Sequence, residues 1–172
     1  MFDRLFKPRP AAEKGRALYL SMIRQARRPE FYAELGVADT GEGRFELYAL
    51  HLALLLRRLK RQGPEAEEVS QSLFEAFVNG LDDGLREMGV SDVGIGRKMR
   101  KLGEAAYGRV KGYDAALDGR EDLEALVRRT AFSGREDAEA ARLADYARRS
   151  DAVLAATTTA EVMAGETAWP TI

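Results

Sequence analysis

The chain has 172 residues, of which 45% are hydrophobic and 32% are charged, a balance typical of one folded domain with a sizeable core. It contains no cysteine, which excludes disulfide frameworks, thiolate metal sites and cysteine nucleophiles. His51 is the only histidine, so a two-histidine metal site cannot form within one chain and a Ser-His-Asp triad would have to include it. Most of the common enzyme chemistries are therefore disfavoured.

The formal net charge of −1 conceals three segregated blocks. Residues 1–28 have a net charge of +6, residues 65–92 of −7 and residues 97–111 of +5. Such blocks can steer a charged partner or a membrane surface toward the molecule. They are equally consistent with basic and acidic helices that face one another inside the fold.

Apolar residues recur at three- and four-residue steps through most of the chain, which indicates amphipathic helices. The spacing predicts helices over 11–28, 30–35, 45–59, 64–88, 95–113, 123–132 and 137–156. No segment shows the alternation of a strand. We therefore expect an all-α fold, a single-domain helical bundle of about six to eight helices.

The division along the chain is a basic N-terminal segment over 1–10, a helical domain over 11–156 and a loosely attached C-terminal tail over 157–172. The longest apolar stretch, 47–56, has ten residues, whereas a bilayer span needs about 20. This stretch therefore predicts a buried core helix. His51 lies within it, beside leucines and no carboxylate, and we interpret it as a hydrogen-bonded core or interface histidine rather than a metal or haem ligand.

Two further patterns are weak as sites. Gly89, Gly94 and Gly96 surround a short connection that fails the phosphate-loop pattern, because no Ser or Thr follows Lys98. The acids at 82–87 lie on one helix, where neighbouring side chains point apart, so a solvated surface is the better interpretation. The sequence predicts no cofactor and no metal.

The predicted helix over 97–111 carries a basic face opposite its apolar face. Such a face can meet the phosphates of lipid or RNA. Tyr107 is the single aromatic beside it, and no RNA-binding signature accompanies it, so no specific nucleic-acid sequence is expected as a partner.

Several separated blocks resemble the ubiquinol–cytochrome c chaperone family. The first runs through residues 25–32 (QARRPEFY), 36–40 (GVADT) and 43–46 (GRFE). The second runs through residues 85–92 (LREMGVSD) and 97–101 (RKMRK), followed by Tyr107 and Arg109. Order and spacing agree from about Ala17 to about Tyr146, with Ser91 where the family pattern favours glycine and Arg100 where it favours lysine.

The resemblance implies a non-enzymatic assembly factor of respiratory complex III. Such a chaperone binds newly made cytochrome b, and the implied partners include a small partner protein, the ribosome or an anionic membrane surface. The implied location is the cytoplasm, with attachment at the inner face of the plasma membrane.

The same resemblance places the partner-binding surface in the second block. The predicted residues are Arg86, Glu87, Asp92, Arg97, Lys98, Met99, Lys101, Tyr107 and Arg109. An open alternative is that Arg86, Glu87, Asp92 and Arg109 form an internal polar network that fixes the loop between two helices. The alternative function is a peripheral membrane or lipid-binding protein that uses the basic face over 97–111. An enzyme organised around His51 and the acids at 82–87 comes third.

Overall fold

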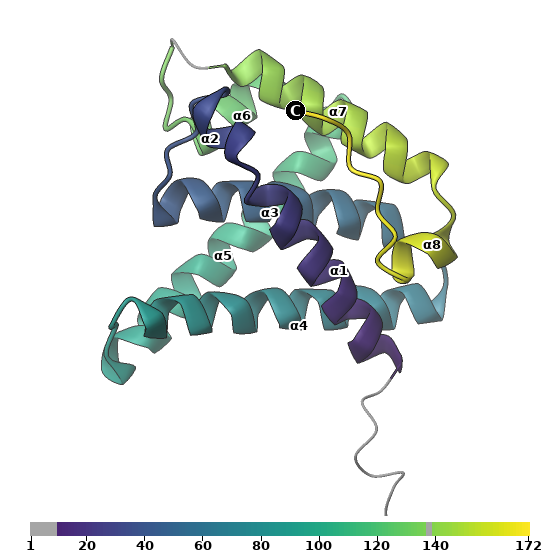
Figure 1. The fold of residues 1–172 in the computed structure, drawn as a ribbon, viewed down its shortest axis with the longest axis horizontal. Helices are drawn as coiled ribbons and strands as arrows, with labels where there is room; N and C mark the ends of the chain where they lie inside the picture. The colour runs from purple at the N-terminus through teal and green to yellow at the C-terminus, as the bar shows by residue number, and fades with distance from the viewer. Residues whose placement is uncertain (1–9, 137–138) are drawn as a thin grey trace, which may run out of the picture.

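The computed structural model describes residues 10–136 and 139–172, without the side chains of residues 92 and 93. The basic N-terminal segment predicted over 1–10 lies outside the described residues, apart from Pro10. The described chain forms eight helices and contains no strand, which confirms the predicted all-α bundle (Figure 1). The helices are α1 (Pro10–Ala26), α2 (Pro29–Ala33), α3 (Gly41–Leu59), α4 (Pro64–Glu87), α5 (Asp92–Leu117), α6 (Leu123–Ala131), α7 (Ala140–Ala156) and α8 (Thr159–Met163).

Local chemistry explains the helix ends. The central helix α3 begins four residues earlier than predicted, because the Thr40 hydroxyl accepts a hydrogen bond from the Gly43 N–H at 3.1 Å and caps the first turn. Helix α4 begins at Pro64 and is followed by Gly89 with a φ of 76°, the left-handed conformation that glycine adopts freely. Pro64 and Gly89 therefore mark the start and the end of α4, close to the predicted bounds.

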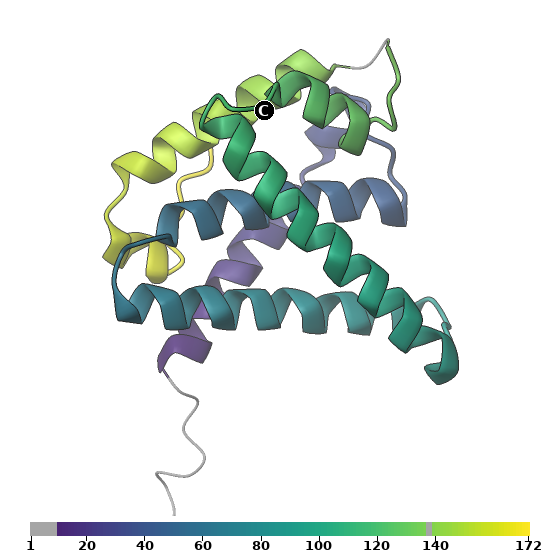
Figure 2. The same ribbon diagram turned by 180° about the vertical axis from the view of Figure 1, so that it is seen from behind.

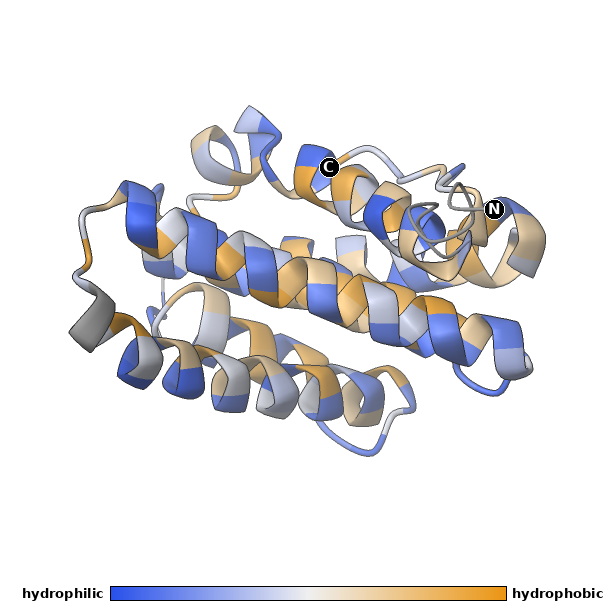
Figure 3. Cartoon of the chain, turned by 90° about the horizontal axis from the view of Figure 1, so that it is seen from below, coloured by the Kyte–Doolittle hydropathy of each residue, from blue (hydrophilic) through white to orange (hydrophobic). Residues whose placement is uncertain are grey.

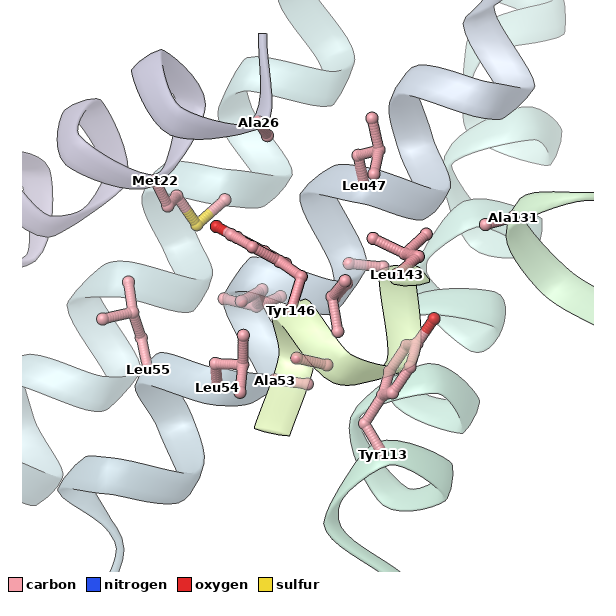
Figure 4. Close-up of a cluster of buried hydrophobic side chains, with 14 of the residues drawn as sticks. Met22, Ala26, Leu47, Ala53, Leu54, Leu55, Tyr113, Ala131, Leu143 and Tyr146 are labelled. Atoms are coloured by element: carbon pink, nitrogen blue, oxygen red, sulfur yellow. The ribbon is translucent and has the colours of Figure 1, made fainter. Parts of the chain in front are cut away.

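Helix α3 is the centre of the fold, with α1, α5 and α7 packed around it (Figures 1 and 2). Eleven of the fifteen residues from Phe45 to Leu59 are buried, which confirms the predicted core helix. Met22 from α1, Tyr146 from α7 and Tyr113 from α5 belong to one buried cluster with the leucines of α3 (Figure 4). None of the described helices has the length and apolar character needed to cross a membrane.

One arginine ties three helices together at the end of α3. The Arg57 guanidinium donates to Asp114 of α5 at 2.8 Å, to Asp118 just after α5 at 2.7 Å, and to Asp151 of α7 at 3.0 Å. These bonds raise the pKa of Arg57 and keep it charged. A basic block and an acidic block do also meet within the fold, since Lys14 of α1 pairs with Glu65 of α4.

The C-terminal segment is not loosely attached, so that expectation was wrong. Residues 159–163 form α8, whose Val162 is fully buried. Beyond it, the Trp169 ring lies 5.0 Å from the His51 ring in an edge contact, and its indole N–H donates to the Ser21 hydroxyl at 3.2 Å. The Arg149 side chain donates to the Thr171 carbonyl at 2.7 Å. The sequence suggested a loose tail because Gly165 and Pro170 interrupt any helical pattern, but an irregular segment can still pack.

Candidate functional site

A groove of about 1210 Å³ opens between α1, α3, α4 and α5, with the end of α6 at one side. This volume exceeds that of a typical small-molecule pocket, roughly 300–1000 Å³. Seven charged residues line it together with nine aromatic or large aliphatic residues, and this apolar set is Tyr19, Ile23, Phe45, Tyr48, Phe77, Leu81, Leu85, Met88 and Leu102. The groove therefore offers an extended apolar surface rather than a closed cavity for a small ligand.

Two glycines of α4 line this groove, and only the second of them lies beneath empty space. Gly80 and Gly84 are four residues apart and both line it. A Cβ added at Gly80 would lie 1.9 Å from the Tyr19 hydroxyl oxygen, so the tyrosine ring packs directly on the α4 backbone there. A Cβ at Gly84 would meet nothing within 4 Å, so the space above this residue is empty.

A partly buried ion pair forms part of the groove wall. Glu46 of α3 is only 9% exposed and accepts two hydrogen bonds of 2.7 Å each from the Arg109 guanidinium of α5. The bond to Glu46 raises the pKa of Arg109 and holds it charged. Because two rigid helices supply the two halves, this pair fixes the spacing of α3 and α5 at the groove.

Other charged side chains surround the apolar floor. Arg44 donates to Asp39 at 2.7 Å, and Arg27 donates to the Tyr48 hydroxyl at 2.7 Å, which raises the pKa of Arg27. The remaining charged residues of the lining are Glu42, Glu87 and Arg129. Burial raises the pKa of Tyr19 in the groove wall, so its phenol stays neutral and adds no charge at ordinary pH. The groove thus combines an apolar floor with a rim of both charge signs.

The structure divides the predicted partner-binding residues into two groups. Glu87 and Arg109 line the groove, as the neighbouring Met88 does. Arg97, Lys98 and Lys101 lie elsewhere, exposed to solvent along the first turns of α5.

The remaining predicted residues lie near these groups. Tyr107 is 58% exposed, with the Lys111 ammonium 4.5 Å from its ring centroid, and Met99 is partly buried. Arg86 donates to Asp82 one turn earlier on α4 at 2.7 Å. The backbone of Asp92 begins α5, but its side chain lies outside the described part of the structure.

In the alternative interpretation, Arg109 and Glu87 belong to a polar network that fixes the α4–α5 loop, and the structure shows different surroundings for both. Arg109 is held by Glu46 of α3, a residue that the sequence analysis did not single out. Glu87 is exposed at the groove. The contact that engages Arg109 is therefore one between α3 and α5.

Most of the groove residues were missed from the sequence. Phe77, Leu81, Leu85 and Met88 were predicted to lie on one apolar core face of α4. Phe77 and Leu85 are buried, as predicted, whereas Met88 is 67% exposed, because the pattern does not reveal where a covering helix ends. The useful signal was the pair Gly80 and Gly84, which interrupts this face with missing side chains.

His51 is a hydrogen-bonded core histidine, as predicted. The Leu47 carbonyl, which can only accept, lies 2.7 Å from Nδ1, so Nδ1 carries the proton. Nε2 therefore accepts from the Tyr146 hydroxyl at 2.8 Å, and that hydroxyl oxygen accepts from the Gln25 amide at 3.0 Å. Burial lowers the pKa of His51 to about 4, so it is neutral at ordinary pH.

The family model described as ubiquinol-cytochrome C chaperone matches residues 33–169, which include α3 to α8. The chain belongs to the ubiquinol–cytochrome c chaperone family. The match includes the α3, α4 and α5 residues that line the groove and the C-terminal segment as far as Trp169, whereas α1 precedes it. The predicted family membership is thereby confirmed.

This chain is also similar to two known proteins. The crystal structure of the Cbp3 homolog from Brucella abortus has a TM-score of 0.85 and 31% identity, over 99% of this chain and 97% of that chain. The ubiquinol-cytochrome-c reductase complex assembly factor 1 of Xenopus laevis is 22% identical over 100 residues, which are 58% of this chain. The match spans about half of that relative, 50% of its length.

Proposed function

We propose that this chain is a non-enzymatic assembly factor that binds newly made cytochrome b and assists biogenesis of ubiquinol–cytochrome c reductase, respiratory complex III. Family membership and the name of the Xenopus laevis relative support the role in assembly of that complex. The observation that carries the client proposal is the groove, which is open, extended and apolar.

The chemistry of the groove suits an apolar helical segment. A helix that presents one apolar face is held in such a groove by burial of side chains that recur every three or four residues. The rim offers both cations and acids, which can pair with charged residues at the ends of an otherwise apolar client segment. Newly made segments of a membrane subunit present such faces before they are packed.

Filling the groove tests the proposal. Gly84→Leu places a side chain in the empty space above α4, whereas Gly108→Leu makes the same change at an exposed position of α5 that meets nothing within 4 Å. Both replace a helical glycine and are expected to stabilise the helix by a similar amount, roughly 0.5–1 kcal/mol. The pair therefore separates groove occupancy from stability.

The measurement is assembled complex III and spectroscopic cytochrome b in a host whose own copy is deleted. We expect Gly84→Leu to lower both toward the level of the deletion strain and Gly108→Leu to restore them. If the deletion itself leaves complex III unchanged, the proposed function is wrong. If Gly84→Leu restores assembly fully, the client binds elsewhere.

Direct contact between the groove and cytochrome b is tested by replacing Leu81, which lines the groove, with a photo-crosslinking residue. The same replacement at Leu20 is the control. Leu20 is an exposed apolar residue of α1 that does not line the groove. We expect cytochrome b to be captured from Leu81 and not from Leu20. Equal capture from both positions would argue against the groove as the client site.

A further inference from the structure

The first turns of α5 carry a cluster of cations that the fold does not neutralise. Arg97, Lys98, Arg100 and Lys101, here called the α5 basic face, are all exposed, and none forms an ion pair with another described residue. Many other arginines of the chain do have acidic partners, among them Arg57 and Arg109. At 100° per residue the four cations fall within about 160° of the helix circumference, opposite the sector of the buried Ile95 and Ala106. The fold therefore directs this charge outward.

The position of the α5 basic face suits a broad surface. The joined ends of α4 and α5 project beyond the neighbouring helices (Figure 2). Seen from below, hydrophilic residues follow the outer side of α5 from the residues drawn in grey onward (Figure 3). Glu104 is the one acid among residues 97–104, which therefore keep a net charge of +3.

Two exposed apolar side chains belong to the same helix hairpin as this charge. Met88 at the end of α4 is 67% exposed, and Tyr107 of α5 is 58% exposed. These two residues and Leu20 are the only large hydrophobic side chains that are exposed in the described part of the chain. Two of the three therefore lie at the end of α4 or on α5, the elements that carry the basic face.

We propose that the α5 basic face docks onto an anionic lipid surface. Clustered Lys and Arg are attracted to the negative surface of a membrane, and exposed apolar side chains enter its interfacial region. RNA is the less suitable occupant because stacking platforms need several aromatics, and Tyr107 is alone beside these cations. An acidic protein would match the charge but would leave Met88 without an apolar counterpart.

Docking in this way has a consequence that rests on the proposed function. Met88 is exposed at the end of α4 that leads into α5, and it is also part of the groove lining. Attachment through α5 would thus hold one end of the groove close to the membrane surface. A client segment that leaves or enters the bilayer would meet the groove there.

The test is cosedimentation of the full chain with vesicles of phosphatidylcholine alone or mixed with phosphatidylglycerol. Each cation near an anionic surface raises partitioning roughly fivefold, so Lys98→Gln with Lys101→Gln should weaken binding to the mixed vesicles by roughly 25-fold. The matched control is Arg16→Gln with Arg24→Gln on α1, which removes the same charge from two exposed residues outside the basic face. We expect the control to bind like the wild type.

Three results would overturn the docking proposal. The first is vesicle binding that does not depend on phosphatidylglycerol. The second is an equal loss of vesicle binding in both double variants. The third is a Lys98→Gln, Lys101→Gln variant that loses binding to an RNA oligonucleotide but keeps its binding to the vesicles. Because no client is present, the vesicle result is independent of the proposed function. Gly84→Leu should bind these vesicles normally even though its assembly activity is lost.

Discussion

The two sides of α1 differ in whether other parts of the chain cover them. On one side, Ser21 bonds Trp169 of the C-terminal segment and Gln25 bonds Tyr146. The Trp169 ring also packs against the His51 ring and covers this side. On the other side, Tyr19 and Ile23 line an open groove. One helix thus separates a closed aromatic cluster from an apolar surface that is left uncovered.

The difference lies in how polar groups are satisfied. On the closed side, a chain of hydrogen bonds runs from Gln25 through Tyr146 and His51 to the Leu47 carbonyl, and each group has a neutral partner inside the protein. On the open side, the charged rim faces solvent around an apolar floor. The closed side is built for stability, whereas the open side keeps binding groups available.

The largest effect that we expect from this contrast is a pH dependence that belongs to the closed side. The pKa of His51 is lowered by burial from 6.5 to about 4, so as pH falls the unfolded chain takes up the proton first. The stability that His51 contributes is present above pH 6.5 and is lost as pH falls toward about 4. The total loss is up to roughly 3 kcal/mol, at 1.36 kcal/mol for each unit of pKa shift.

Urea unfolding across this interval measures the effect. His51→Gln removes the titrating group, so its stability should fall less steeply with decreasing pH than that of the wild type, although it begins lower at neutral pH. Parallel pH profiles of the two proteins would contradict a buried neutral histidine.

Next in size is the loss of the Trp169 contacts. Trp169→Ala removes a partly buried ring that contacts His51 and bonds Ser21, and we expect a destabilisation of roughly 2–3 kcal/mol, below the range for a fully buried aromatic. Met88→Ala, on the open side, should change the free energy of unfolding by less than about 0.5 kcal/mol. Urea unfolding of both variants checks the contrast, and equal destabilisation would remove it.

The smallest expected effect is the coupling between Glu46 and Arg109 at the groove. Because Arg109 is partly exposed to solvent, we expect a coupling energy of only about 1 kcal/mol. A double-mutant cycle of Glu46→Gln and Arg109→Gln measures it. A coupling energy of zero would mean that this pair does not fix the spacing of α3 and α5.

Much of the fold followed from periodicity and punctuation. The apolar steps in 45–59 predicted the central helix, and Pro64 and Gly89 marked both ends of α4. The site was predicted less well. Glu87 and Arg109 do line the groove, and Phe77 and Leu85 on its floor are buried, as expected of a core face. The open end at Met88 was not predicted, because a one-dimensional pattern cannot show which part of an apolar face another helix covers.

The helical class, the core position of His51 and the positive charge at the start of α5 could all be predicted from residue spacing, since each depends on neighbours within a few residues of the chain. The packing of Trp169 on His51, the pairing of Glu46 with Arg109 and the empty space above Gly84 became visible only in the folded chain. These contacts join residues that are far apart in the sequence, and they depend on how the helices cross, which local spacing does not specify.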